Sequence, residues 1–283
     1  MTELLTVLSN LATLVFVISS MLALGLGLTV KQILDPLKDV GLVLRALGAN
    51  FVLVPLAAYV LKTIIPLDPS LGIGLILLAT AAGAPFLPKL AQAAKADVAF
   101  SVGLMVLLMV VTVVYVPVVL PLLLPGVSVN PADIARSLIV LMLIPLAIGL
   151  LINARYGDIA RGLQPHMAQA SSTSLIAVFV LMLVLNFETM VGAIGSGAII
   201  AAILFIVISL AIGYVLGPTT PTRPVMGLGT AQRNIAAAMV VATGNFSDDP
   251  NVLTMILVGA LLMLVILMPV AGEMGKRGRP AEV

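Results

Sequence analysis

Long apolar runs separated by short polar segments make up almost the whole chain. A membrane-spanning helix needs about 20 predominantly apolar residues. Nine runs meet this length: 4–28, 41–63, 69–96, 98–124, 134–154, 167–190, 195–216, 222–245 and 250–272. They lack the alternation of apolar and polar residues that is typical of a membrane β-barrel. The pattern therefore predicts an all-α polytopic membrane protein with nine transmembrane helices.

Composition supports a membrane location. Of the 283 residues, 61% are hydrophobic and 9% are charged, and the mean hydropathy is +1.24. A soluble domain averages about 25% charged residues. The first apolar run is too long for a signal peptide and its early charge is acidic, Glu3, so we expect it to be retained as a helix. The lipid bilayer is therefore the first expected partner.

The polar loops predict an orientation. We expect the protein in the cell (inner) membrane with its N-terminus outside and its C-terminus cytoplasmic, because most basic residues then lie on the cytoplasmic side. Lys62 and Arg136 are the exceptions. The cytoplasmic side then carries Lys31, Lys38, Lys95, Arg155, Arg161, Arg223, Lys276, Arg277 and Arg279, and the outer side Asp68, Asp133, Glu188, Asp248 and Asp249. We read the net charge of +2 as a sign of topology.

Several function classes find no support in the sequence. The chain has no cysteine and one histidine, His166, whereas a metal site normally needs three or four ligands. We therefore expect no metal and no cofactor. No basic tract interleaved with aromatic residues suggests nucleic acid. An intramembrane enzyme would need a nucleophile–base pair or a metal motif such as HExxH, and neither is present. A primary pump would need a Walker A motif, which is also missing.

The third and eighth predicted helices both contain helix-breaking residues near their centres. The third holds Gly83, Pro85 and Pro88, and proline removes a backbone donor and clashes with the preceding turn. The eighth reads GLGTAQRN from Gly227 to Asn234, and we expect its two glycines to open the helix. Such glycines and prolines can merely kink a membrane helix. Two interrupted helices in corresponding places, however, are the best sequence indication of a transporter's binding site.

The spacing of these two helices predicts an inverted repeat. Helices five apart cross the membrane in opposite directions, so the first, second and fourth helices would match the sixth, seventh and ninth. The fifth has no counterpart, as if the first helix of the first repeat were missing. We expect a first repeat over 1–125 and a second over 126–283, together forming one transporter domain.

Several stretches resemble the bile acid:sodium symporter family. They are Met21–Leu61, with Asn50-Phe51 followed by Val54-Pro55; Leu71–Leu104, with Gly83-Ala84-Pro85-Phe86-Leu87-Pro88, Ala93-Ala94-Lys95-Ala96-Asp97 and Ala99-Phe100-Ser101-Val102; and Gly229-Thr230-Ala231-Gln232-Arg233-Asn234. The resemblance covers nearly the whole chain. It implies a panel domain beside a core domain, in which the two interrupted helices cross near the bilayer midplane.

The sodium ligands of that family are mostly replaced here. The resemblance implies ligands from a Ser-Asn pair on the third helix, Ser and Thr on the fourth, Glu and Gln on the eighth and a Gln on the second. The corresponding residues are Leu87-Pro88, Ser101 and Met105, Gly229 and Arg233, and Asn50. Since leucine, proline and arginine side chains supply no oxygen ligand, sodium coupling is doubtful.

Arg233 is the most unusual residue of the membrane interior. An arginine at the bilayer centre costs at least about 2.5–3.5 kcal/mol, so it needs partners or a wet cavity. In one interpretation it occupies the sodium site and donates to the free carbonyls of the interrupted helices. In the other it binds an anionic substrate. Lys89 either reaches the cytoplasmic surface or is a second cavity cation. Ser9, Asn10, Thr13 and Ser171–Ser174 either line the cavity or bond within their own helices.

We therefore expect a secondary transporter of small organic anions, carboxylates or sulfonates, that works by alternating access. Coupling to protons or sodium stays open. The expected binding residues are Asn50, Gly83, Pro85, Ser101, Gly229, Thr230, Gln232, Arg233 and Asn234. The alternatives are a sodium-coupled symporter of bile-acid-like anions, and a channel or non-transporting membrane scaffold.

Overall fold

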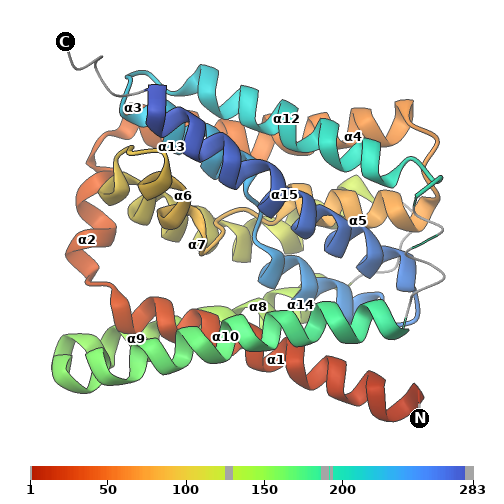
Figure 1. Cartoon of the computed structure of the whole chain (residues 1–283), viewed down its shortest axis with the longest axis horizontal. Coiled ribbons are helices and arrows are strands. Elements are labelled where there is room, and N and C mark those ends of the chain that lie inside the picture. The colour runs from red at the N-terminus through yellow and green to blue at the C-terminus, as the bar shows by residue number, and fades with distance from the viewer. Residues whose placement is uncertain (1, 125–129, 186–190, 192–193, 278–283) are drawn as a thin grey trace.

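The computed structural model describes residues 2–124, 130–185, 191 and 194–277, and every regular element in these ranges is helical (Figure 1). The elements of the first half are α1 (Thr2–Gly27), α2 (Val30–Leu34), η1 (Asp35–Lys38), α3 (Val40–Gly48), η2 (Ala49–Leu53), α4 (Val54–Ile64), α5 (Pro69–Thr80), α6 (Leu87–Ala93) and α7 (Val98–Leu123). Those of the second half are α8 (Pro131–Leu138), η3 (Ile139–Leu143), α9 (Ile144–Arg155), α10 (Gly157–Leu185), α12 (Ala198–Leu216), α13 (Thr222–Ala231), α14 (Ile235–Asn245) and α15 (Pro250–Arg277).

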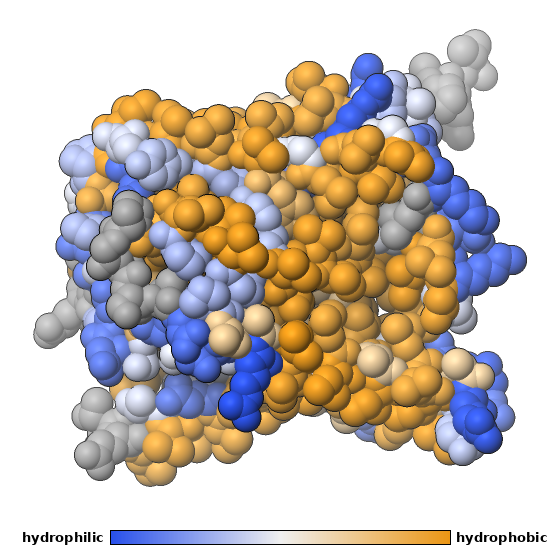
Figure 2. All heavy atoms as spheres, turned by 180° about the vertical axis from the view of Figure 1, so that it is seen from behind, coloured by the Kyte–Doolittle hydropathy of each residue, from blue (hydrophilic) through white to orange (hydrophobic). Residues whose placement is uncertain are grey.

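Six helices of the described chain are long and apolar enough to cross a membrane. They cover Leu4–Gly27, Val40–Ile64, Val98–Leu123, Pro131–Arg155, Ala198–Leu216 and Pro250–Lys276. The π-helical turns η2 and η3 join α3 to α4 and α8 to α9, so these pairs act as continuous helices. Figure 2 shows apolar residues across the middle of one face and hydrophilic residues gathered toward its left and right ends. This is the surface expected of helices that lie in a bilayer.

Acidic and amide side chains define where several of these helices begin. Asp97 accepts a hydrogen bond from the N–H of Phe100 at the start of α7, and Asn130 accepts one from Ala132 at the start of α8. Asp68 does the same for α5 through the N–H of Ser70. Such capping satisfies N–H groups that the helix itself leaves free. These acidic and amide residues between helices therefore act as helix caps.

The helices form two groups. Helices α1, α9 and α10 pack against one another and lie along the lower side of Figure 1. The other long helices lie above them, with α15 packed on α5 and α12 packed on α4 and α13. The lower group is tightly built, because a Cβ on Gly25 of α1 would overlap the backbone of α9, and a Cβ on Gly149 of α9 would lie 2.8 Å from the carbonyl oxygen of Leu22. Small residues at such positions let membrane helices approach closely.

Candidate ion and substrate site at the helix breaks

The first interruption lies between α5 and α6 and confirms the prediction for residues 69–96. Helix α5 ends at Thr80 and α6 begins at Leu87. Gly83 has φ +81°, and a Cβ there would overlap the backbone of Met109. Only glycine adopts this conformation without strain. Pro88 is the second residue of α6, where a missing N–H does no harm. Pro88 therefore lies in the first turn of the second half-helix and not in the break itself.

The second interruption is also confirmed, but its predicted cause is wrong. Gly227 and Gly229 lie inside α13, which continues to Ala231, and the break falls at Gln232–Asn234. A glycine costs a helix only about 1 kcal/mol, so the glycines alone do not end it. Their role is close packing, since a Cβ on Gly229 would lie 2.9 Å from Leu87 Cδ2. The break forms where Asn234 turns to cap α14 by accepting from the N–H of Ala237.

The two breaks contact each other directly. The N–H of Asn234 donates to the carbonyl of Ala81 at 2.8 Å, and its Nδ2 donates to the carbonyl of Gly83 at 2.9 Å. Helices α5 and α14 lead from the breaks toward the right of Figure 1, and α6 and α13 toward the left. The interrupted helices thus run in opposite directions and meet at their centres.

A threonine that we did not predict completes the first break. Thr112 Oγ1 accepts from the N–H of Ala82 at 3.0 Å and donates to the carbonyl of the same residue at 3.1 Å. Both backbone groups of a residue outside any helix are thereby satisfied, as buried peptide groups require. Thr112 is the one polar residue in the middle of the apolar α7 run LLMVVTVV, and that isolation is the signal that could have found it.

Arg233 is completely buried at the crossing, with 0% of its side chain exposed. Its Nε donates to the carbonyl of Leu78 at 3.0 Å and Nη2 to that of Ala79 at 2.6 Å. Its Nη1 donates to the carbonyl of Thr230 at 3.0 Å and to Asn50 Oδ1 at 2.7 Å. Four of the five guanidinium N–H donors therefore have protein acceptors.

The acceptors of Arg233 lie at the carboxyl ends of two half-helices. Leu78 and Ala79 belong to the last turn of α5, and Thr230 to the last turn of α13. Carbonyl groups there have no intrahelical donor and carry the negative end of the helix dipole. The ion pairs found in the described ranges all lie on exposed side chains, away from Arg233. Backbone dipoles, together with the Asn50 oxygen, therefore stabilise the guanidinium charge.

Asn50 reaches Arg233 from the π-helical turn η2. Pro55 has no N–H to donate to the turn before it, and the carbonyl of Phe51, four residues earlier, accepts from Tyr115 Oη at 2.6 Å instead. The Nδ2 of Asn50 donates to the carbonyl of Ala46 at 3.0 Å and to Thr230 Oγ1 at 3.2 Å. π-Helical turns occur frequently at functional sites. Tyr115 and the π-turn were not predicted, although Pro55 was a signal.

Ser101, Pro85 and Lys89 were also singled out from the sequence, and each lies in a different environment. Ser101 is buried, but its Oγ donates at 2.6 Å to Val98 of its own helix, and Met105 near it is fully buried. Pro85 lies in the turn before α6 and is partly buried. Lys89 is exposed, with Nζ 5.6 Å from the ring centroid of Phe86. Of the outlying serines and threonines, Thr13 and Ser172 bond to carbonyls of their own helices.

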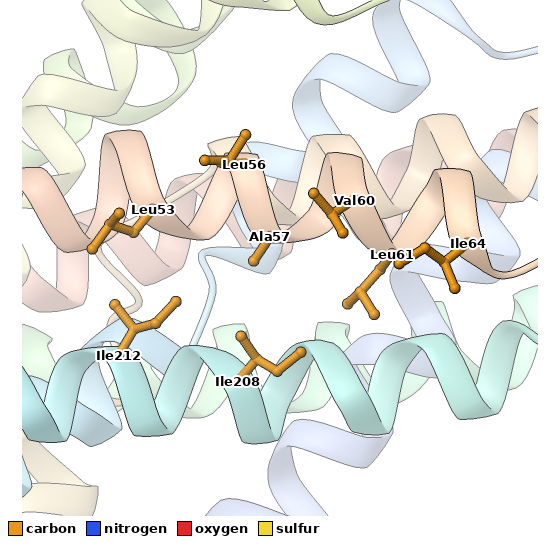
Figure 3. A pocket seen from close by; sticks show the side chains of 8 residues that line it. All are labelled: Leu53, Leu56, Ala57, Val60, Leu61, Ile64, Ile208 and Ile212. Carbon is orange, nitrogen blue, oxygen red and sulfur yellow. The ribbon is translucent and has the colours of Figure 1, made fainter.

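An apolar groove elsewhere on the molecule is unsuited to an anion. Figure 3 shows the groove between α4 and α12. Its lining is entirely aliphatic: Leu53, Leu56, Ala57, Val60, Leu61, Ile64, Ile208 and Ile212. These side chains offer no hydrogen-bond donor. The polar groups that could bind an ion or an anionic substrate gather instead at the two breaks.

A family model described as the sodium bile acid symporter family matches residues 14–216, which is more than half of the chain. The match includes the first break and ends before α13, so Arg233 lies beyond it. A search of curated proteins gave no match. Members of the matched family are transporters and not enzymes. The chain therefore belongs to the sodium bile acid symporter family and is a multi-pass membrane protein.

Proposed function

We propose that the protein is a secondary transporter of small organic anions, of the carboxylate or sulfonate type, that works without sodium coupling. Family membership supports secondary transport. The single observation that carries the rest is the environment of Arg233, a fully buried guanidinium on carbonyl groups of both broken helices. In this proposal a covalently attached cation replaces a dissociable one.

The acceptors around Arg233 are of the kind that bind sodium in other transporters. In many transporter folds, carbonyl groups at the carboxyl ends of half-helices coordinate the coupling ion, such as sodium. Here those carbonyls at Leu78, Ala79 and Thr230 are occupied by guanidinium N–H groups. A sodium ion at this place would have to displace a charged group that is tethered beside it. Sodium stimulation is therefore not expected.

The packing around the site supports the same proposal. The resemblance implies a glutamate at the position of Gly229 and a serine at the position of Leu87. In this chain the side chain of Leu87 is buried and fills the space beside Gly229. An apolar contact thus lies where the resemblance implies two sodium ligands. The replacements are consistent with one another, because the oxygen ligands are missing in the same chain that has an arginine at the site.

The positive charge of the site favours an anionic substrate. Arg233 keeps its charge at physiological pH, and the described ion pairs leave it without a carboxylate partner. Helix α14 begins one residue after Asn234, so the positive end of its dipole also lies at the crossing. We propose that the crossing residues Asn50, Thr230, Arg233 and Asn234 form a positively charged floor, against which an anion binds from the Gln232 side.

We further propose the architecture that alternating access requires. The group α1, α9 and α10, with α8, is the panel, and the remaining helices are the core. Nine spans result when α5–α6 and α13–α14 each count as one interrupted helix. The repeats are 1–125 and 126–283, the breaks lie near the bilayer midplane, and the N-terminus lies outside. The opposite directions of the interrupted helices support this assignment.

Uptake into proteoliposomes tests the proposal. The purified protein is reconstituted, and uptake of radiolabelled carboxylates and sulfonates is measured in sodium and in potassium at equal ionic strength. We expect saturable uptake of at least one anion at equal rates in both salts. A saturable, sodium-selective stimulation would overturn the proposal and favour the alternative of a sodium-coupled symporter. Large currents that rise linearly with concentration would indicate a channel, and no uptake of any anion a scaffold.

A further inference from the structure

One polar side chain at the crossing uses none of its hydrogen-bonding capacity within the described residues. Gln232 has its Oε1 buried and without a hydrogen-bond partner there, and only 8% of the residue is exposed. The side chains of Thr230, Arg233 and Asn234 beside it all form hydrogen bonds. Buried polar groups are nearly always paired, so an unpaired one requires an explanation.

The backbone directs Gln232 away from the occupied cation site. Gln232 has φ −78° and ψ 114°, and Asn234 has φ −81° and ψ 91°, so the backbone is extended at both residues that flank Arg233. Successive side chains of an extended segment point to opposite sides. Arg233 points to the carbonyl ends of α5. This alternation implies that Gln232 points away from those carbonyls, in the segment that leads into α14.

The chemistry of the unpaired atom specifies its ligand. A carboxamide oxygen accepts hydrogen bonds, and its partner must carry an O–H or an N–H. A bare carboxylate or sulfonate is only an acceptor and cannot satisfy it. If the two ends of the amide exchange places, the buried end becomes a donor, but the amide still offers one donor and one acceptor together. A substrate group that both donates and accepts, such as a hydroxyl, satisfies either arrangement.

We propose that Gln232 is a specificity-determining residue that binds a hydroxyl or amide N–H of the substrate, next to its acidic group. The transported anion is then a hydroxylated or amidated acid and not a simple alkyl carboxylate. This inference rests on the proposed function, and it makes the unpaired oxygen the recognition element. Sites that hydrogen-bond a substrate hydroxyl discriminate strongly against the analogue that lacks it.

Matched pairs of acids test this proposal. Lactate is compared with propionate, and mandelate with phenylacetate, so that each pair differs by one hydroxyl. Their effect on the melting temperature and their competition against uptake are measured for the wild type, Gln232→Met and Gln92→Met. The methionine keeps the length of the side chain and removes the amide. Gln92 is an exposed glutamine near the end of α6 and is the matched control.

We expect the wild type and Gln92→Met to favour the hydroxylated member of a pair about tenfold, the effect of one hydrogen bond. In Gln232→Met the two members should become equal. Without any ligand, Gln232→Met should melt at or above the wild-type temperature, because it removes an unpaired buried group. A preference that persists in Gln232→Met, an absent preference in the wild type, or a lower melting temperature of ligand-free Gln232→Met would each overturn the inference. If no acid of either pair binds the wild type, the ligand-free melting temperature still decides the role of Gln232, and the proposed function is judged separately by the uptake of carboxylates and sulfonates into proteoliposomes.

Discussion

The two helix breaks are built from opposite chemistry. The break between α5 and α6 is made by glycine and proline, and it presents backbone acceptors, the carbonyls of Leu78, Ala79, Ala81 and Gly83. The break between α13 and α14 is made by polar residues, and it presents donors from Arg233 and Asn234.

This difference means that the donors of one break pair with the acceptors of the other. Two breaks that both presented carbonyl groups would need a cation between them. In this chain the second break brings its own cation and amide donors, so the acceptors of the first break are satisfied by protein. Substitutions can disrupt the crossing at either break, by removing the donors of one or the backbone geometry of the other.

Removal of Arg233 should have the largest effect. Arg233→Met leaves the carbonyls of Leu78, Ala79 and Thr230 and the oxygen of Asn50 without a donor. Each unsatisfied buried group costs about 1–3 kcal/mol. Some relaxation will recover part of this loss, so we expect a destabilisation of about 3–5 kcal/mol. The measurement is the melting temperature of ligand-free protein in detergent.

The exposed Arg136 provides the matched control, and Arg136→Met should melt like the wild type. Arg233→Lys keeps the charge but loses the planar fork, so it should fall between the wild type and Arg233→Met. Unchanged melting of Arg233→Met together with abolished anion binding would contradict our interpretation. Arg233 would then be a substrate residue first.

Gly83→Ala attacks the other break. The backbone φ of +81° is strained for alanine, and its Cβ would overlap the backbone of Met109. The left-handed conformation alone costs about 1–2 kcal/mol, and the overlap adds to it, so we expect about 2–4 kcal/mol in total. Gly244→Ala in α14 is the control, because a Cβ there meets no atom within 4 Å. Equal melting temperatures of the two variants would show that the first break tolerates another geometry.

Thr112→Val tests the support of the first break by α7. Valine has nearly the same shape but leaves the N–H and the carbonyl of Ala82 unpaired. We expect a loss of about 1–3 kcal/mol, seen as a lower melting temperature and faster hydrogen exchange at Ala82. Thr63→Val is the comparison, since Thr63 is exposed and bonds only within its own helix turn. Similar melting of both variants would mean that Ala82 finds other partners.

The sequence predicts the existence of both breaks, the first from Gly83, Pro85 and Pro88 and the second from Gly227 and Gly229, because glycine and proline weaken a helix. It does not predict where the second break falls. Gly227 and Gly229 suggested the wrong place, since a glycine in a membrane helix serves close packing as readily as a break, and the distinction depends on Leu87 from another helix. The π-helical turn at Asn50 was also missed, because the carbonyl of Phe51 in this turn depends on a hydrogen bond from Tyr115 of α7. Contacts between distant segments decide these features.

The smallest expected effect is the stabilisation by sodium of a variant in which a sodium site is rebuilt. The variant combines Arg233→Gln, Gly229→Glu, Leu87→Ser and Pro88→Asn, which restores most of the ligands that the resemblance implies. Gly229→Glu alone should destabilise the protein, because its Cβ would lie 2.9 Å from Leu87 Cδ2. Leu87→Ser removes that contact, so the two changes are expected to compensate each other.

Sodium should stabilise the rebuilt protein and leave the wild type unaffected. A ligand present at about ten times its Kd stabilises the native state by about 1.4 kcal/mol, from RT ln(1 + [L]/Kd). The melting temperature is measured in sodium and in potassium chloride at equal ionic strength, so that general salt effects cancel. If the wild type gains as much from sodium as the rebuilt variant, then the guanidinium does not exclude the ion. In that case sodium would bind at a second site near the α5–α6 break, one that Arg233 does not occupy.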